Sequence, residues 1–176
     1  MINNRNFTDK DIDTILKNMV ILVDTREKAN THITEWLEYK NRCEWIKMKL
    51  NNGDYSCMLK AMPEFGITHD LYFHNEFSIE RKNSLDEISQ NFTKNRTRFE
   101  EELATKKGQM IIAIEDDWTN LFQGNYQSKY DRRSFIASIM AFWHRYDVPF
   151  VFLDKEEIPV FIYTHMRYFL REKLKS

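Results

Sequence analysis

Three acidic residues and one lysine have the types and positions that phosphodiester hydrolysis needs. Asp54 follows a glycine turn, and Glu80 and Lys82 lie two residues apart in a largely apolar segment. A divalent metal must neutralise the phosphate and activate a water, and Mg²⁺ prefers oxygen ligands. Asp54 and Glu80 supply two carboxylates, Asp24 can supply a third, and the main-chain carbonyl of Arg81 can complete the coordination. Lys82 can hold or deprotonate the water, or stabilise the pentacovalent phosphorus.

A strand is the element that would present this pair correctly. Side chains alternate along a strand, so Glu80 and Lys82 would share one face while Arg81 points to the other. The alternative is a surface charge run on an edge strand. With 27 acidic residues in the chain, this spacing can arise by chance.

The neighbouring strands must bring the other two acids to the same place. A short loop joins the strands expected at 55–59 and 71–82, so they can pair and carry Asp54 toward the charged pair. Asp24 ends the apolar run at 20–23, which is expected to be a buried central strand. Ligand crevices of α/β sheets form where such strands end.

The remaining sequence predicts alternating strands and helices. Further strands are expected at 45–50, 110–114 and 148–153, with a three-strand antiparallel stretch formed by 45–50, 55–59 and 71–82. Helices are expected after capping boxes at Thr8 and Ser84, the second continuing to Gly108, and also at 31–40, 135–143 and 158–169. The order predicts an α/β protein with a central mixed β-sheet and helices on both faces.

Composition limits the class of protein. With 176 residues, 42% of them hydrophobic, the chain suits one domain with a real core. The formal net charge of -1 means that DNA contact would need local clusters of Lys and Arg. The two cysteines form no CxxC pair, the N-terminus lacks the apolar stretch of a signal peptide, and no segment is long and apolar enough for a membrane span. A soluble, intracellular protein with no membrane association is expected.

Three separated motifs resemble the nuclease domain of the XPF/Mus-type structure-specific endonucleases. They are Val23-Asp24-Thr25-Arg26-Glu27, Gly53-Asp54-Tyr55, and Ile79-Glu80-Arg81-Lys82-Asn83-Ser84-Leu85-Asp86. The family signature is Gly-Asp, a gap, Glu-Arg-Lys, three residues and Asp, and all of it stands here in order. The resemblance runs from about residue 20 to about residue 170, within a single nuclease domain at 1–176.

The resemblance implies a restriction-endonuclease-like α/β/α sandwich and Mg²⁺- or Mn²⁺-dependent cleavage of branched, flapped or nicked DNA. It implies that the metal-site acids are Asp24, Asp54 and Glu80, that the catalytic basic pair is Arg81 and Lys82, and that the supporting active-site residues are Arg26, Glu27 and Asp86. For Arg26 and Glu27 the alternative is a mutual salt-bridge set that shapes the cleft. For Asp86 it is a favourable contact with the helix dipole.

One feature departs from the better-known family members, which carry a tandem helix-hairpin-helix module after the nuclease domain. Because the chain ends at Ser176, that module is not expected here. DNA grip would then come from the nuclease surface or from a partner, so a homodimer or a protein partner stays open. A compact single-domain form resembles bacterial or phage members of the family. We therefore expect a cytoplasmic, nucleoid-associated protein.

Two basic groups are candidates for contact with the DNA backbone. Lys94, Arg96 and Arg98 follow the catalytic strand, and either Arg96 or Arg98 can be the arginine that the family has near this place. Arg132 and Arg133 open a later helix, where positive charge opposes the helix dipole. The alternative for the first group is a solvated helix face balanced by neighbouring glutamates.

Two other functions remain open. One is a non-catalytic pseudo-nuclease that binds DNA or scaffolds a catalytic partner, although such family members lose the acidic and lysine residues that remain here. The other is an RNA or small-molecule phosphodiesterase on the same fold.

Overall fold

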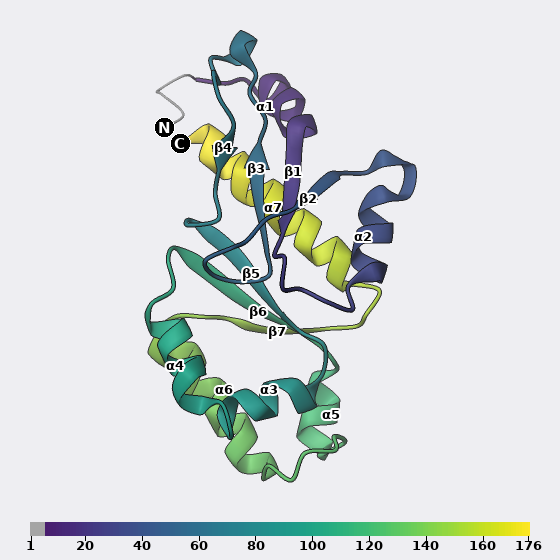
Figure 1. The fold of residues 1–176 in the computed structure, drawn as a ribbon, viewed down its shortest axis with the longest axis vertical. Helices are drawn as coiled ribbons and strands as arrows, with labels where there is room; N and C mark the ends of the chain where they lie inside the picture. The colour runs from purple at the N-terminus through teal and green to yellow at the C-terminus, as the bar shows by residue number, and fades with distance from the viewer. Residues whose placement is uncertain (1–5) are drawn as a thin grey trace.

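The computed structural model describes residues 6–176, which form one mixed seven-stranded sheet with helices on both faces (Figure 1). The strands are β1 (Met19–Val23), β2 (Glu44–Lys47), β3 (Tyr55–Leu59), β4 (Leu71–Tyr72), β5 (Phe77–Lys82), β6 (Gln109–Glu115) and β7 (Phe150–Leu153). Their order is β2-β1-β3-β5-β6-β7, and β4 pairs with β3. The expected α/β class with a central mixed sheet is confirmed.

The helices divide into two groups. They are α1 (Asp9–Ile15), α2 (Thr31–Glu38), α3 (Leu85–Phe92), α4 (Arg96–Ala104), α5 (Trp118–Gln123), α6 (Arg132–Tyr146) and α7 (Ile158–Lys175), with short 3₁₀ turns at Leu16–Asn18, Tyr39–Asn41 and Pro63–Phe65. In Figure 1, α3 to α6 gather at one end of the molecule, whereas α7 lies beside β1 and β3 together with α1 and α2. No helix within 6–176 is long and apolar enough to cross a membrane. The expectation about a signal peptide concerns the N-terminus, and residues 1–5 of it lie outside the described part.

Alternation along β6 separates two hydrophobic cores. Ile111 and Ala113 pack with α1, α2 and α7, whereas Ile112 and Ile114 pack with α3 to α6. On β5, Ile79 belongs to the first core. Because side chains alternate, Arg81 points toward the first core, and Glu80 and Lys82 point to the opposite face.

The pairing of the strands differs from one expectation. β2 does not join an antiparallel stretch with β3; it pairs in parallel with β1, while β3 runs antiparallel to both β1 and β5. The reason is that α2 lies between β1 and β2 and provides the crossover that a parallel pair requires. β5, β6 and β7 are parallel, as the later helix–strand alternation predicts.

Two long elements predicted from periodicity are broken. The strand expected at 71–82 is interrupted by a turn in which the amides of Glu76 and Phe77 both donate to the carbonyl of Phe73, at 2.8 and 3.0 Å. The helix expected from Ser84 to Gly108 breaks at Thr93, whose ψ of -90° is not helical. Helix α5, between an Asp117 cap and Gly124, was not predicted because it is too short to show periodicity.

The turn before β3 sets the position of Asp54. Gly53 has a φ of +69°, and a Cβ atom there would lie 2.8 Å from the Cβ of Ser78. Only glycine therefore lets this turn approach β5 so closely. The Asp54 amide then donates to Ile79 O at 2.9 Å, and its carbonyl accepts from the Asp24 amide at 2.8 Å. The expected convergence of Asp24, Asp54 and the end of β5 at one sheet edge is therefore observed.

Candidate active site

A cleft of about 360 Å³ opens at this edge, between the turn before β3 and helix α4. Its lining residues are Arg26, Asn51, Asn52, Gly53, Asp54, Glu80, Lys82, Asn91, Asn95, Arg98, Phe99, Glu102, Leu103, Thr105 and Met110. Sequence reasoning missed the asparagines of this set. Asn52 Nδ2 and Asn91 Oδ1 are shielded from solvent and have no hydrogen-bond partner among the described residues. No motif in the sequence marks these residues as part of a site.

Asp54 and Glu80 contribute two carboxyl groups to the lining of the cleft. The amide of Arg81 donates to Asp54 Oδ2 at 2.8 Å and fixes this side chain against β5. Burial raises the pKa of Asp54 well above its ordinary value, and the negative charges of Glu80 and Glu27 raise it further. A divalent cation would relieve that repulsion, and carboxylate oxygens suit Mg²⁺ or Mn²⁺. The donor set therefore fits a metal held by these two acids.

Lys82 is the cation of the same face. Its Nζ donates to Glu80 Oε1 at 2.7 Å and lies 3.7 Å from Glu87 Oε1. Burial lowers the pKa of Lys82, but the charge and hydrogen bond of Glu80, with the charge of Glu87, outweigh burial and raise it to about 12. Lys82 is therefore a protonated donor at neutral pH. Of the roles expected for it, this arrangement favours holding a water or an anion over removing a proton.

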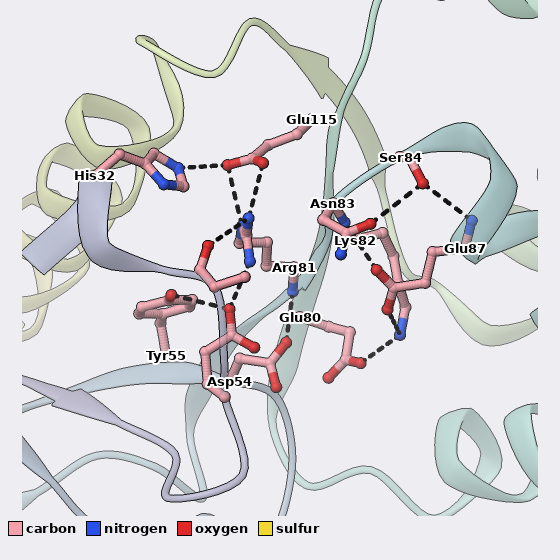
Figure 2. A network of polar contacts seen from close by, with 12 residues as sticks. His32, Asp54, Tyr55, Glu80, Arg81, Lys82, Asn83, Ser84, Glu87 and Glu115 are labelled. Atoms are coloured by element: carbon pink, nitrogen blue, oxygen red, sulfur yellow. Dashed lines mark hydrogen bonds and ion pairs between the residues drawn. The ribbon is translucent and has the colours of Figure 1, made fainter.

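Arg81 lies on the opposite face of β5, in a separate ionic network (Figure 2). Its Nε and Nη2 donate to the two oxygens of Glu115 at 3.0 and 2.7 Å, and its Nη1 donates to Glu27 at 2.7 Å. His32 and the Tyr55 hydroxyl extend the network, contacting Glu115 at 2.6 Å and Glu27 at 3.2 Å. The guanidinium is thus enclosed and directed away from Lys82, although the two were expected to act as a basic pair.

Sequence reasoning missed Glu115 and His32. Glu115 ends an apolar run just as Asp24 does, so the same criterion would have selected it. His32 carries no comparable signal, because its contact with Glu115 joins residues 83 positions apart.

Asp24 does not line the cleft, and its carboxylate is bound by other residues. Its Oδ1 accepts from the amide and Nε of Arg26, both at 2.7 Å, and its Oδ2 accepts from the Leu50 amide at 2.6 Å. Burial raises the pKa of Asp24, but the hydrogen bonds from Arg26 and Leu50 outweigh burial and hold it below its ordinary value. Within residues 6–176, no three acidic, His or Cys side chains are grouped as a metal site.

The supporting residues occupy three different positions. Arg26 and Glu27 do not pair with each other: the first binds Asp24 and the second binds Arg81. Asp86, at the start of α3, accepts hydrogen bonds from the amides of Ser128 and Gln127, at 2.6 and 3.3 Å. Asp86 therefore holds the loop between α5 and α6 and does not line the cleft with Asp54 and Glu80. Its role is also more than the expected contact with the helix dipole.

The basic candidates also separate. Arg98 lines the cleft, with its Nε 2.8 Å from Glu102, whereas Arg96 binds Glu100 at 3.2 Å and lies over the Phe142 ring outside the lining. Lys94 is exposed in the turn between α3 and α4. Arg132 and Arg133 are exposed at the start of α6, and Arg132 Nη1 donates to the carbonyl of Phe122 at 3.2 Å.

Comparison with known proteins gives one family match and related structures. The model of the ERCC4 domain matches residues 23–163. XPF from Aeropyrum pernix superimposes with a TM-score of 0.60 at 19% identity, over 85% of this chain and 60% of that chain. XPF from Aeropyrum pernix in complex with DNA gives a TM-score of 0.61 at 19% identity, over 87% and 66%.

No sequence among the curated proteins matches. The chain spans about three fifths of the length of the first XPF structure, and at 19% identity the likeness establishes the fold alone.

The family model covers most of the chain and includes all three motifs around the cleft. The chain therefore belongs to the ERCC4-domain family of XPF-type nucleases.

Proposed function

We propose that this protein is a metal-dependent endonuclease that hydrolyses phosphodiester bonds in branched, flapped or nicked DNA, and that residues 1–176 act as one nuclease domain. The observation that carries the proposal is the cleft in which the Asp54 and Glu80 carboxyl groups lie beside the Lys82 ammonium. Two acids and a cation at a sheet edge match the needs of phosphate neutralisation and water activation.

Each group has a separate task. Asp54 and Glu80 would hold Mg²⁺ or Mn²⁺, which when bound neutralises the phosphate and lowers the pKa of a bound water. Glu80 orients Lys82 through their 2.7 Å hydrogen bond. Lys82 donates to the attacking water or to a phosphate oxygen, and its positive charge stabilises the negative charge that develops during attack.

DNA contact is proposed for the basic residues of the cleft rim. Arg98 lies in the lining and Lys94 is exposed one turn before it, so both can reach phosphates of a strand entering the cleft. Arg132 and Arg133 are proposed to contact phosphates farther along the duplex. The structure of XPF from Aeropyrum pernix in complex with DNA supports DNA as the substrate class.

Cleavage of a panel of labelled flap, fork, nicked and single-stranded substrates with Mg²⁺ or Mn²⁺ tests the proposal. Asp54→Asn, Glu80→Gln and Lys82→Met should each lower the rate by about a thousandfold or more, which corresponds to about 4 kcal/mol of lost transition-state stabilisation. Glu64→Gln, in the 3₁₀ turn Pro63–Phe65 outside the cleft lining, is the matched control and should cut like wild type.

The same panel distinguishes the alternatives. An Asp54→Asn variant that cuts as fast as wild type would contradict the assignment of the site. Wild-type protein that binds DNA without cutting any substrate would be a non-catalytic binding module. Equal or faster cleavage of RNA versions of the same substrates would indicate an RNA phosphodiesterase.

A further inference from the structure

The pair formed by Asp24 and Arg26 lies at the rim of the cleft and has no task in the chemistry above. We propose that Asp24 is not a metal ligand and instead holds Arg26 as a binding site for a phosphate of the substrate strand. The inference rests on the proposed function, because it assigns a phosphodiester as the ligand of Arg26.

Both oxygens of the Asp24 carboxylate are hydrogen-bonded within the protein. The side chain is buried, and its two oxygens accept four hydrogen bonds: two at 2.7 Å from the Arg26 amide and Nε, one at 3.2 Å from Arg26 Nη2, and one at 2.6 Å from the Leu50 amide. A metal bound by Asp24 would break this charge-assisted fork. It would also leave the amide of Leu50, a residue only 1% exposed, without a partner, and unsatisfied buried donors are costly.

The same contacts leave one side of Arg26 open. Nε and Nη2 are bound to Asp24, and Nη2 also donates to the carbonyl of Leu50 at 3.1 Å. Nη1 donates to no residue within 6–176, so its two N–H groups are open to a ligand. The Arg26 side chain is 63% exposed and lines the cleft with Asp54, Glu80 and Lys82.

No other arginine of this region combines these properties. Arg81 has each of its three nitrogens bound within the protein, and its side chain is only 4% exposed. Arg98 also lines the cleft, but a single bond from its Nε to the half-exposed Glu102 holds it. Arg26 is held more firmly, by both oxygens of the buried Asp24 and by the carbonyl of Leu50. A guanidinium whose orientation is fixed and whose outer N–H groups are open suits the oxygens of a phosphate, which accept such donors with defined geometry.

Metal binding tests the first half of the proposal without any cleavage. Mn²⁺ is titrated into metal-free protein and followed by electron paramagnetic resonance. Asp54→Asn and Glu80→Gln should weaken binding at least about tenfold, whereas Asp24→Asn should stay within about threefold of wild type. An Asp24→Asn variant that loses as much Mn²⁺ affinity as Asp54→Asn, while circular dichroism shows it folded, would overturn the proposal. If Asp24→Asn does not fold, Asp24→Ser replaces it, with the same expected Mn²⁺ affinity and the same criterion, because its hydroxyl can still accept a hydrogen bond but cannot supply a carboxylate to a metal.

DNA binding tests the second half. Affinity for a flap substrate is measured by fluorescence anisotropy in Ca²⁺ at several salt concentrations. Arg26→Gln should bind about tenfold more weakly, with the slope of log K against log salt reduced by about 1. Arg26→Lys should recover part of the affinity, because it keeps the charge but not the planar fork. Wild-type affinity and slope in Arg26→Gln would exclude the phosphate site.

The two proposals can fail separately. A wild-type protein that cuts no substrate would remove the proposed enzymatic function, while the Mn²⁺ and anisotropy results would still decide the roles of Asp24 and Arg26. A wild-type protein that binds neither Mn²⁺ nor DNA would overturn both proposals.

Discussion

The charged residues on the two faces of β5 differ in their access to a ligand. On one face, the side chains of Arg81, Glu27 and Glu115 are 4%, 12% and 7% exposed and are bound to one another. On the other face, Glu80 and Lys82 are 21% and 9% exposed and open into the cleft beside Asp54. Figure 2 shows Arg81 directed toward Glu115 on one side of β5, and Glu80 with Lys82 on the other.

The difference between the faces indicates how the work is divided. On the closed face, the guanidinium and both carboxylates satisfy one another, so this face can fix the position of β5 but has little left to offer a ligand. On the open face, Asp54 and Glu80 repel each other, and a strongly perturbed pKa in a cleft is typical of a functional site. Stability is therefore expected to depend on the closed face and cleavage on the open one.

The largest effect on stability is expected from the closed face. Arg81→Leu removes the cation between two buried carboxylates, and breaking a buried pair by deleting one partner costs about 3–5 kcal/mol. Urea unfolding followed by circular dichroism measures the loss. Arg98→Leu is the control, since its ion pair with Glu102 is exposed and should cost less than about 1 kcal/mol. An Arg81→Leu protein within 1 kcal/mol of wild type would contradict the division of roles.

A smaller, pH-dependent effect is expected from Lys82 on the open face. Its pKa is raised from 10.5 to about 12, so its charged form stabilises the folded state fully below pH 10.5 and loses that effect as pH rises toward 12. The difference in unfolding free energy between wild type and Lys82→Met, measured without metal, should be constant from about pH 7 to 10 and should then shrink by about 2 kcal/mol. A decrease already at about pH 8 would mean that Lys82 can act as a base.

The smallest effect concerns the rim of the cleft. Arg98→Gln should weaken DNA binding several-fold, because each lost phosphate contact lowers affinity in a salt-dependent way. Arg96→Gln should have less effect on DNA, since this residue lies outside the lining between Glu100 and the Phe142 ring. Fluorescence anisotropy of both variants on one substrate settles the order. A larger loss for Arg96→Gln would move the DNA path away from the cleft.

Much of the fold was predictable because it depends on local patterns. The apolar runs at 20–23 and 110–114 are buried strands, and the Thr8 capping box starts α1 as expected. Alternation within β5 correctly separated Arg81 from Glu80 and Lys82. Periodicity failed at Thr93, where the backbone leaves the helical conformation although the apolar spacing continues. At Thr93 the hydroxyl donates to the carbonyl of Ser89 at 2.8 Å as the helix ends, and no hydrophobic pattern records such a contact.

The sequence by itself indicated that Asp54, Glu80 and Lys82 come together, since the Gly-Asp and Glu-Arg-Lys motifs and the strand period are encoded along the chain. Only the tertiary structure decided what each carboxylate contacts. Asp24 turns to Arg26 and Leu50, Asp86 turns to the loop before α6, and Glu115 enters the network of Arg81. A carboxylate binds whichever donors the fold brings within about 3 Å, and those donors come from segments far apart in the sequence.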